Sequence, residues 1–437
     1  MLNNFGFKKM RCGVMSRDCL LIRNAGPLSG EVTLEGAKNA VLVSIASLIL
    51  ADGLSRLTKV PASHDVYQMV KALGELGIAA SFDERTHELV VDATTVSGVT
   101  VSPEIMKSMR ASILLMGPLL ARCGSARIAL PGGCSIGTRP VDLHLRAFVK
   151  MGAVLIQDGD FLEARVNGQL KGCRIVLDYP SVGATENIIM AALGAHGITE
   201  IVNAALEPEV LDFIELLKSM GAQIDFTFPA TIVVQGDARL RATTYCIMRD
   251  RLEAGTLLMA AAATGGSISI PDAPVSALEL VLVKLEDMGH LITVGSQGRG
   301  VTLVATREMK PISFKTMPYP GFPTDLQAPM TVLMALARGT SSVHETVFEN
   351  RLMHVPELQK MGANIVVSGD RATITGVKEL CGAPVVATDI RSAAALIIAG
   401  LVAQGETSMT GTHHLFRGYE GLDEKLRSLG ACIDFVN

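Results

Sequence analysis

The sequence repeats one unit of about 70 residues six times, which limits the chain to folds built from six similar modules. In each unit an amphipathic stretch ends with an aliphatic residue and a glycine. These glycines are Gly77, Gly152, Gly221, Gly289, Gly362 and Gly430, at intervals of 75, 69, 68, 73 and 68 residues. A second marker, an apolar stretch rich in small residues, ends at Gly53, Gly124, Gly197, Gly265, Gly339 and Gly405. Two independent markers keep the same spacing, so the repeat organises the whole chain.

Each unit has the pattern of a mixed α/β module. The apolar stretch has no polar face, which is the composition of a helix buried on all sides, and the glycine at its end suits a helix C-terminus. A short β-rich segment follows, then an amphipathic helix such as residues 141–152, and then a hairpin such as residues 154–166 with an Asp-Gly turn. We therefore predict an α/β fold of six βαβαββ-type units. Three buried helices with sheets outside form one inverted α/β barrel, so six units predict a two-lobed protein.

The two ends of the chain predict how the lobes are connected. The sixth unit stops before its second hairpin strand, whereas residues 18–38 contain that strand and one more. We expect one lobe of three units at residues 39–248, and a second lobe at residues 1–38 plus 249–437. The chain then crosses between the lobes near Lys38 and near Arg249. Two crossings form a hinge, and paired lobes on a hinge can close over a ligand.

The composition excludes several classes of partner. There are 43 acidic and 39 basic residues, without runs of one sign, so neither nucleic acid nor an anionic membrane is an expected partner. The longest apolar run, residues 393–403, is shorter than the ~20 residues that cross a bilayer, and no signal-peptide core follows the N-terminus. The eight cysteines form no CxxC pair, which indicates reduced thiols. We expect a cytoplasmic protein without a membrane-inserted segment.

Charged residues stand where the buried helices begin. They are Lys38, Arg110, Arg251, Asp325, Asp389 and Arg391. A helix N-terminus already presents free N–H groups and the positive end of its dipole, so lysine and arginine there concentrate positive potential and favour an anion. For any one residue, a cap or an ion pair on its own helix is the simpler explanation. The recurrence in several units favours a shared anion site between the lobes.

A second unusual segment is the loop at residues 130–144, which follows a predicted strand and holds three glycines and two prolines. It contains Cys134 and Arg139, with His144 just beyond. A thiol beside a guanidinium on an exposed glycine-rich loop should have a lowered pKa and react as the thiolate. The alternative is a small buried cysteine, which we expect for the other cysteines of the chain.

Other kinds of site have little support. Asp325 enters a buried helix after Pro-Thr, where it acts either as an N-cap, worth ~1 kcal/mol, or as a base facing the cleft. The histidines at 344, 354, 413 and 414 lack the i, i+4 spacing of metal ligands, so we expect no metal. Dinucleotide and Walker-type phosphate loops are both missing from the sequence, and we expect no cofactor.

Eight motifs of the chain belong together. They lie at residues 36–40, 109–112, 131–144, 181–185, 322–327, 349–358, 388–392 and 417–420. In this combination the chain resembles the UDP-N-acetylglucosamine 1-carboxyvinyltransferases, a family of enolpyruvyl transferases, over roughly residues 18–437. The resemblance implies a two-lobed fold of six units. It also implies transfer of the enolpyruvyl group of phosphoenolpyruvate to the 3′-hydroxyl of UDP-N-acetylglucosamine with release of phosphate, the first committed step of peptidoglycan synthesis.

The same resemblance implies a role for each reactive residue. Cys134 would donate a proton to the methylene carbon of phosphoenolpyruvate, can form a phospholactoyl adduct, and is the thiol that fosfomycin alkylates in such enzymes. Asp325 would accept the proton of the sugar hydroxyl. Lys38, Arg139 and Arg417 would hold the phosphate. Arg391 would lie near the carboxylate of phosphoenolpyruvate.

The resemblance also implies a binding surface for the nucleotide sugar. Its residues are Asn39, Arg110, Arg139, Pro140, Val141, Asp142, Leu143, Tyr179, Pro180, Ser181, Val182, Asp325 and Val347. Arg351 and Asp389 lie in the same motifs and are further candidates for substrate binding; Asp389 either takes part in catalysis or orients Arg391. The chain departs from the family pattern at Tyr179, where some relatives carry a lysine, so a charged contact near the uridine is not expected.

Two other functions stay open at the level of sequence. A 3-phosphoshikimate enolpyruvyl transferase shares the fold, but is not expected to carry Cys134 or the segment at residues 139–144. A non-catalytic paralogue that binds UDP-N-acetylglucosamine is the second. The presence of Cys134, Asp325 and Lys38 argues against lost chemistry.

Overall fold

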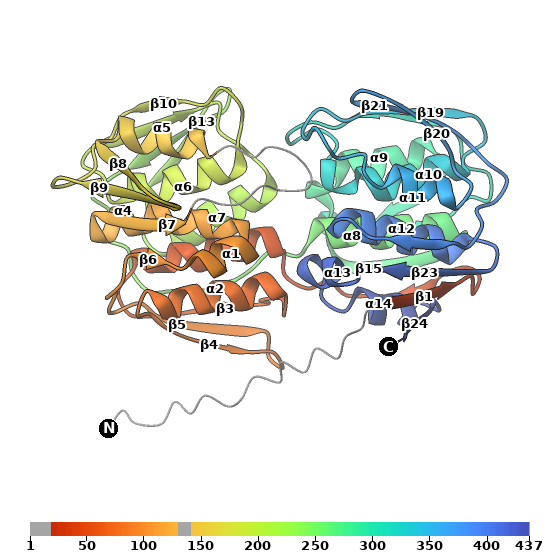
Figure 1. Cartoon of the computed structure of the whole chain (residues 1–437), viewed down its shortest axis with the longest axis horizontal. Helices are drawn as coiled ribbons and strands as arrows, with labels where there is room; N and C mark the ends of the chain where they lie inside the picture. The colour runs from red at the N-terminus through yellow and green to blue at the C-terminus, as the bar shows by residue number, and fades with distance from the viewer. Residues whose placement is uncertain (1–18, 130–140, 437) are drawn as a thin grey trace.

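The computed structural model describes residues 19–129 and 141–436, which form two lobes side by side (Figure 1). The buried hydrophobic side chains divide into two clusters. One extends from Ala37 to Ile247, and the other combines Leu20 to Leu34 with Leu252 to Ile433. We call the parts of the chain around these clusters the first and the second lobe.

Three helical segments form the centre of each lobe. They are α1 (Lys38–Ser47), η2 (Arg110–Leu115) continued by α4 (Met116–Cys123), and α6 (Val182–Leu193) in the first lobe, and α8 (Arg251–Thr264), α10 (Gln327–Leu336) and α12 (Ile390–Val402) in the second. The helices of each lobe pack against one another and are buried along most of their length; in α6 every residue from Ala184 to Leu193 is buried. The prediction that the apolar stretches are buried helices is confirmed.

Three four-stranded sheets lie outside the helices of each lobe. In the first lobe they are β14 (Thr244–Cys246), β3 (Leu54–Thr58), β5 (Glu88–Asp92), β4 (Ala79–Asp83); β6 (Thr100–Val101), β7 (Ser125–Ala129), β9 (Phe161–Val166), β8 (Ala153–Asp158); and β10 (Arg174–Val176), β11 (Ile198–Val202), β13 (Thr231–Gln235), β12 (Ile224–Thr227), in spatial order. In the second they are β2 (Ser29–Glu31), β15 (Ser267–Pro274), β17 (Arg299–Val304), β16 (Leu291–Val294); β18 (Ser313–Lys315), β19 (Thr340–His344), β21 (Arg371–Thr375), β20 (Asn364–Ser368); and β22 (Pro384–Val386), β23 (Glu406–Thr410), β1 (Cys19–Arg23), β24 (Cys432–Val436).

All six sheets have the same topology. The first pair of strands in the order given is parallel, and the other two pairs are antiparallel. One repeated unit of sequence therefore folds into one repeated unit of structure. The sheets are separate from one another, so the strands described here surround the helices without closing into one continuous barrel.

The remaining helices cover the outside and the edges of the lobes. They are α2 (His64–Glu75), α3 (Pro103–Ser108), α5 (Asp142–Lys150), α7 (Pro208–Ser219), α9 (Glu279–Asp287), α11 (Val355–Lys360), α13 (His413–Gly418) and α14 (Leu422–Ser428), with 3₁₀ turns η1 (Leu48–Leu50), η3 (Val275–Ala277), η4 (Ser296–Gly298) and η5 (Thr324–Leu326). Each of the longer ones buries one face: α2 places Val66, Met69 and Leu73 in the core. Among the described helices, none is long and apolar enough to cross a bilayer.

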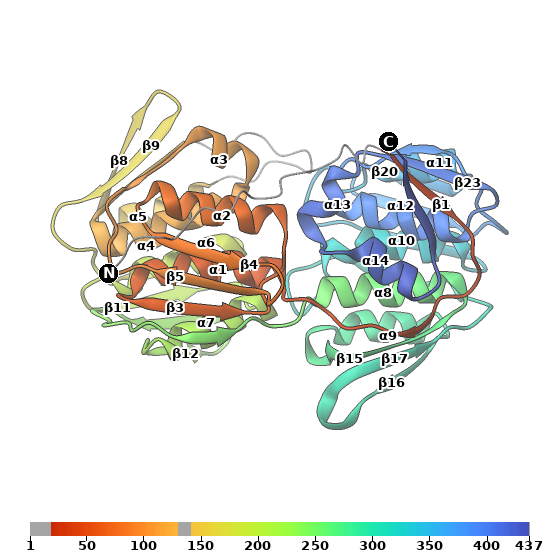
Figure 2. The same ribbon diagram turned by 90° about the horizontal axis from the view of Figure 1, so that it is seen from below.

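The N-terminal strands lie in sheets of the second lobe. β1 pairs with both β23 and β24, with Leu20 opposite Met409 and Phe435, and β2 runs parallel to β15 (Figure 2). The two crossings between the lobes also pair with each other, since Ala37 N–H donates to Met248 O at 2.8 Å and Asp250 N–H donates to Glu35 O at 3.0 Å. The division into domains at residues 38 and 248 stays a prediction.

The contact between α4 and α6 explains why the second residue of α4 is a glycine. Gly117 N–H donates to Asn187 Oδ1 at 2.7 Å, which satisfies one of the free N–H groups of the first helical turn. A Cβ at Gly117 would overlap the carbonyl oxygen of Asn187. The two central helices therefore approach each other as closely as their backbones allow.

Replacing Gly117 with alanine should force α4 and α6 apart. We expect Gly117→Ala to lower the free energy of unfolding by about 1–3 kcal/mol, measured by urea denaturation. Gly74→Ala is the matched control, because Gly74 is exposed in α2 and nothing lies within 4 Å of an added Cβ. The control should be neutral or stabilising by up to about 1 kcal/mol. Equal losses in both variants would contradict the packing argument.

Candidate functional site

A buried carboxylate joins cations of the two lobes. Lys38 begins α1 in the first lobe, and Arg417 extends from α13 in the second. Lys38 Nζ lies 2.6 Å from Asp65 Oδ2, and Arg417 Nε lies 3.5 Å from Asp65 Oδ1. The Asp65 side chain, in the first turn of α2, is only 5% exposed. Two of the residues that the sequence assigns to phosphate binding therefore meet between the lobes.

The charges around Lys38 favour an additional anion. Burial lowers the pKa of Lys38, and the nearby Arg391 and Arg417 lower it further, while Asp65 opposes the shift. Asp65 Oδ1 and Arg417 Nε are buried and have no hydrogen-bond partner among the described residues. An anion placed here would favour the ammonium form of Lys38 by opposing the fall of its pKa, and would accept the unsatisfied N–H of Arg417.

Asp325 is held by two guanidinium groups. Arg351 Nη2 lies 2.5 Å and Arg391 Nε lies 2.9 Å from Asp325 Oδ1. The N-cap alternative for Asp325 is wrong: η5 precedes α10, the N-cap position of α10 is Leu326, and no side-chain cap is formed there. Because the 3₁₀ turn starts one residue before it, Asp325 lies inside the turn, and its carboxylate contacts the two guanidinium groups.

Asp389 caps the helix that carries Arg391. Its Oδ1 accepts hydrogen bonds from Arg391 N–H at 2.8 Å and Ser392 N–H at 3.2 Å, and Ser392 completes a capping box. Of the two roles left open for Asp389, this geometry favours the orientation of Arg391. Its role in substrate binding stays a prediction.

A second buried ion pair links the lobes. Arg251, the first residue of α8, donates to Glu209 of α7 through Nε at 2.9 Å and Nη2 at 3.2 Å, and the two side chains are 8% and 5% exposed. The charge of Arg251 therefore caps no helix; its partner lies in the other lobe. Nearby, Tyr319 N–H donates to Glu207 Oε1 at 3.4 Å, which is another contact between lobes. Burial raises the pKa of Glu207. Burial also raises the pKa of Glu186 well above its usual range, and the charges of Glu209 and Glu207 add to this rise.

Two carboxylates of the site, Asp65 and Glu209, could not be recognised in the sequence. Asp65 and Glu209 lie in first turns of outer helices, where acidic residues are common because they complement the helix dipole. Nothing in the sequence distinguishes these two from ordinary first-turn residues. Their importance follows only from the cations that the tertiary structure brings to them.

The residues predicted to bind the nucleotide sugar lie in several segments. Asn39 is exposed beside Lys38, and residues 141–143 begin α5. Residues 179–182 lead into α6, where Ser181 Oγ accepts a hydrogen bond from Ala184 N–H at 3.4 Å. Burial raises the pKa of Tyr179, and Glu207 and Glu345 raise it further, which places Tyr179 near the second lobe. Val347 N–H donates to Glu345 Oε1 at 2.9 Å, so Val347 lies close to the same carboxylate.

Several predicted site residues cannot be placed. Cys134, Arg139 and Pro140 lie outside the described residues, and the backbone of Arg110 begins η2 without a described side chain. His144 in the first turn of α5 is buried, and its Nδ1 lies 3.0 Å from Asn187 Nδ2 of α6. The start of α5 is thereby fixed against a central helix.

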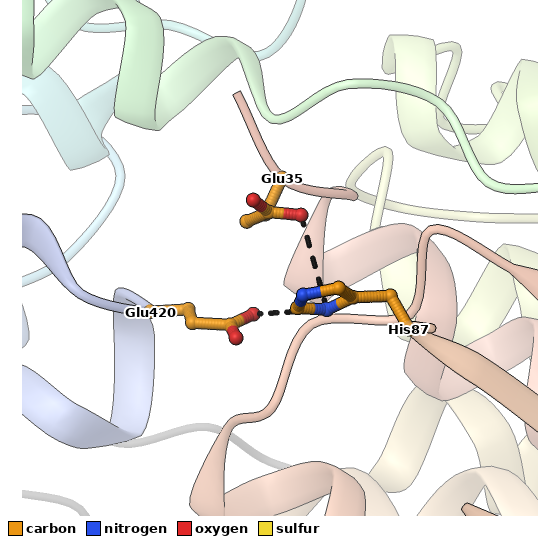
Figure 3. A group of neighbouring side chains, drawn as sticks. All are labelled: Glu35, His87 and Glu420. Atoms are coloured by element: carbon orange, nitrogen blue, oxygen red, sulfur yellow. Dashed lines mark ion pairs between the residues drawn. The ribbon is translucent and has the colours of Figure 1, made fainter. Parts of the chain in front are cut away.

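Two other features of the described chain lie beside this site. Glu35, His87 and Glu420 offer three ligand atoms within 4.8 Å of one another (Figure 3). However, His87 Nδ1 lies 3.1 Å from Val60 O, where it can only donate, so this nitrogen holds a proton rather than a lone pair for a metal. A cavity of about 280 Å³ lies between α9 and residues 319–323, and of the residues discussed above only Arg251 and Tyr319 line it.

Solved structures similar to this one are enolpyruvyl transferases. The enolpyruvyl transferase NikO from Streptomyces tendae superposes with a TM-score of 0.86 at 25% sequence identity, covering 95% of this chain and 98% of that chain. An EPSP synthase from Acinetobacter baumannii has a TM-score of 0.76 at 19% identity, covering 96% of this chain and all of that chain. The fold, two lobes with charged helix starts between them, is that of the enolpyruvyl transferases, and the predicted fold class is confirmed.

The chain belongs to the EPSP synthase family, described as EPSP synthase (3-phosphoshikimate 1-carboxyvinyltransferase), which matches residues 22–426. Among curated relatives, a UDP-N-acetylglucosamine 1-carboxyvinyltransferase of Cellvibrio japonicus is 45% identical over 416 residues, 95% of this chain and 99% of the relative. One of Acinetobacter baylyi is 46% identical over 420 residues, 96% of this chain and 100% of the relative. The resemblance drawn from the motifs is confirmed.

Binding of inorganic phosphate should depend on the protonation of Lys38. The affinity for phosphate should fall as the pH rises through the lowered pKa of Lys38, because only the ammonium attracts the anion. Lys38→Met should weaken binding about 10-fold or more and remove this pH dependence, as measured by isothermal titration calorimetry. Lys71→Met, which removes an exposed lysine of α2, is the control and should bind as the wild type does. The same pH slope in Lys38→Met would exclude Lys38 from the anion site.

Proposed function

We propose that the protein transfers the enolpyruvyl group of phosphoenolpyruvate to the 3′-hydroxyl of UDP-N-acetylglucosamine and releases phosphate. The observation that carries this proposal is the meeting of Lys38, Arg417, Arg391 and Asp325 between the lobes. The relatives at 45% and 46% identity over nearly the whole chain carry this activity in their names and support the choice of acceptor.

The cations suit the charges of phosphoenolpyruvate. Lys38 and Arg417 approach the cleft from opposite lobes and are assigned to the phosphate, together with Arg139. Arg391, whose guanidinium lies against Asp325, is assigned to the carboxylate end. Because phosphate and carboxylate are both negative, an enzyme that closes over this substrate needs several cations from both walls of the cleft.

The transfer needs an acid and a base on opposite sides of the double bond. Asp325 removes the proton of the 3′-hydroxyl while the sugar oxygen attacks C2 of phosphoenolpyruvate and Cys134 gives its thiol proton to C3. The product of this step is a tetrahedral adduct that still carries the phosphate. Loss of a proton from C3 and departure of the phosphate then regenerate the double bond. Acid and base help of this kind is worth ~10²–10⁴ in rate for each group.

The remaining assignments follow the nucleotide sugar. Residues 139–143 and 179–182, with Asn39, Arg110 and Val347, are assigned to UDP-N-acetylglucosamine, and Arg351 and Asp389 support Asp325 and Arg391. No step of this mechanism needs a metal or an organic cofactor. We place the protein in the cytoplasm, which agrees with the described cysteines, all of which are free thiols.

Phosphate release with defined acceptors tests the function. The purified protein is mixed with phosphoenolpyruvate and either UDP-N-acetylglucosamine or shikimate 3-phosphate. We expect phosphate release only with the nucleotide sugar. Release only with shikimate 3-phosphate would instead assign the reaction of the family's description. Binding of UDP-N-acetylglucosamine without release in either mixture would indicate a non-catalytic paralogue.

Fosfomycin tests the assignment of Cys134. Its epoxide should add one inhibitor mass to the intact protein, and peptide mapping should place the mass on Cys134 rather than on a structural cysteine. Cys134→Ser should lose this modification and lower turnover by about 10²-fold or more, because a hydroxyl is a much weaker acid than the thiol. Cys134→Asp should retain activity, since a carboxylic acid can also donate a proton. Cys123→Ser, at an exposed cysteine, is the control. Full activity and unchanged inhibition of Cys134→Ser would exclude Cys134 as the proton donor.

A further inference from the structure

One short segment of the second lobe contacts the first lobe twice. Glu420 Oε2 accepts a hydrogen bond from Ala62 N–H at 2.7 Å. Three residues earlier, Arg417 reaches Asp65 at 3.5 Å and donates to Ser108 O at 3.4 Å. Ala62 and Asp65 both lie where the chain enters α2. The two contacts therefore join the same parts of the two lobes.

The residue between them is fixed in the second lobe. Tyr419 is 3% exposed, its hydroxyl lies 2.9 Å from Thr256 Oγ1 of α8, and its ring centre lies 5.4 Å from Arg391 Cζ. Gly418 packs against Ile390 so closely that a Cβ would overlap the Ile390 side chain. The backbone at residues 417–420 is thus anchored in the core of one lobe while Arg417 and Glu420 reach the other.

The surface that receives Glu420 is itself ordered. His87 Nδ1 donates to Val60 O at 3.1 Å, and Val60 N–H donates to His87 O at 2.9 Å, so the turn between β4 and β5 is held against the segment that leads to Ala62. Figure 3 shows Glu420 and Glu35 both directed toward the His87 ring; His87 Nδ1 lies 3.6 Å from Glu420 Oε2 and 3.9 Å from Glu35 Oε2.

The surroundings of Glu420 disfavour the charged form of its carboxylate. Burial raises the pKa of Glu420 and Glu35 adds to the rise, whereas the hydrogen bond from Ala62, His87 and Lys425 oppose it. A partly buried carboxylate loses part of its hydration, and this raises the free energy of the folded protein unless hydrogen bonds and nearby charges offset the loss. The contact with Ala62 N–H is the shortest of these.

We propose that Glu420 is a positioning residue for the transfer reaction: by accepting the Ala62 N–H it fixes α13 against the first lobe and holds Arg417 beside Lys38. This proposal rests on the role proposed above for Arg417 in binding phosphoenolpyruvate. Glu420 contacts neither the reacting atoms nor Arg417 itself. It acts through the four-residue segment that both side chains share.

Two substitutions distinguish the role of Glu420 as a hydrogen-bond acceptor from the role of its charge. Glu420→Ala removes the acceptor, and Glu420→Gln keeps a carbonyl oxygen at the same distance along the side chain. We expect Glu420→Ala to raise KM for phosphoenolpyruvate about 10-fold or more, with KM for UDP-N-acetylglucosamine changed less than about 3-fold. Glu420→Gln should stay within about 3-fold of the wild type in both constants. The control is Glu424→Ala, which removes an exposed carboxylate four residues further on and should match the wild type.

Amide hydrogen exchange of residues 60–66 reports the contact without turnover. Faster exchange of this segment in Glu420→Ala but not in Glu420→Gln, together with the shift in KM, supports the proposal. Unchanged exchange, or faster exchange with an unchanged KM, overturns it. If the wild-type protein does not release phosphate with UDP-N-acetylglucosamine and phosphoenolpyruvate, the proposed function fails. In that case the calorimetric affinity for inorganic phosphate replaces KM, and an unchanged affinity in Glu420→Ala overturns the positioning role.

Discussion

The pairing of buried charges across the gap between the lobes is the interaction on which the rest of the site depends. Asp65 of the first lobe contacts Lys38 of its own lobe and Arg417 of the other, and Glu209 holds Arg251 in the same way. Removing such charges from water is costly, and the cost is met only while each cation keeps a carboxylate nearby. The carboxylates therefore keep the cations between the lobes, where they favour a ligand that brings negative charges of its own.

The repeat explains why these charges meet. Each unit contributes one buried helix, and in several units a charged residue stands at the start of that helix, so these positions face one region. The two chain crossings run beside it, because α1 and α8 begin at Lys38 and Arg251, directly after the paired segments that contain Ala37 and Asp250. The two chain crossings and the candidate site therefore lie in one neighbourhood.

The charged residues in this neighbourhood have different roles. Asp389 caps α12 and thereby sets the direction of Arg391, and Arg391 and Arg351 hold Asp325. Tyr419 anchors the segment that carries Arg417. Asp389 and Arg351 thus act by placing another charged side chain, whereas Lys38, Arg391 and Arg417 are the cations proposed to contact the substrate. This arrangement agrees with a reaction in which the position of two charged reactants relative to one acid and one base decides the rate.

The sequence by itself determined the fold class, the buried helices and most of the cations of the site, because hydrophobic period and repeat spacing are local properties of the chain. Lys38, Arg251 and Arg391 were found for the same reason: a charge at the start of an apolar helix is visible without a structure. Only the tertiary structure decided which carboxylates they meet. Asp65, Glu209 and Glu420 lie on outer helices or in a turn, where acidic residues are ordinary, and their partners are distant in the chain. The tertiary structure also decided against the N-cap role of Asp325, because the backbone begins a 3₁₀ turn one residue earlier. The ion pairs of Asp325 with two guanidinium groups depend on packing between distant segments, which no local sequence pattern shows.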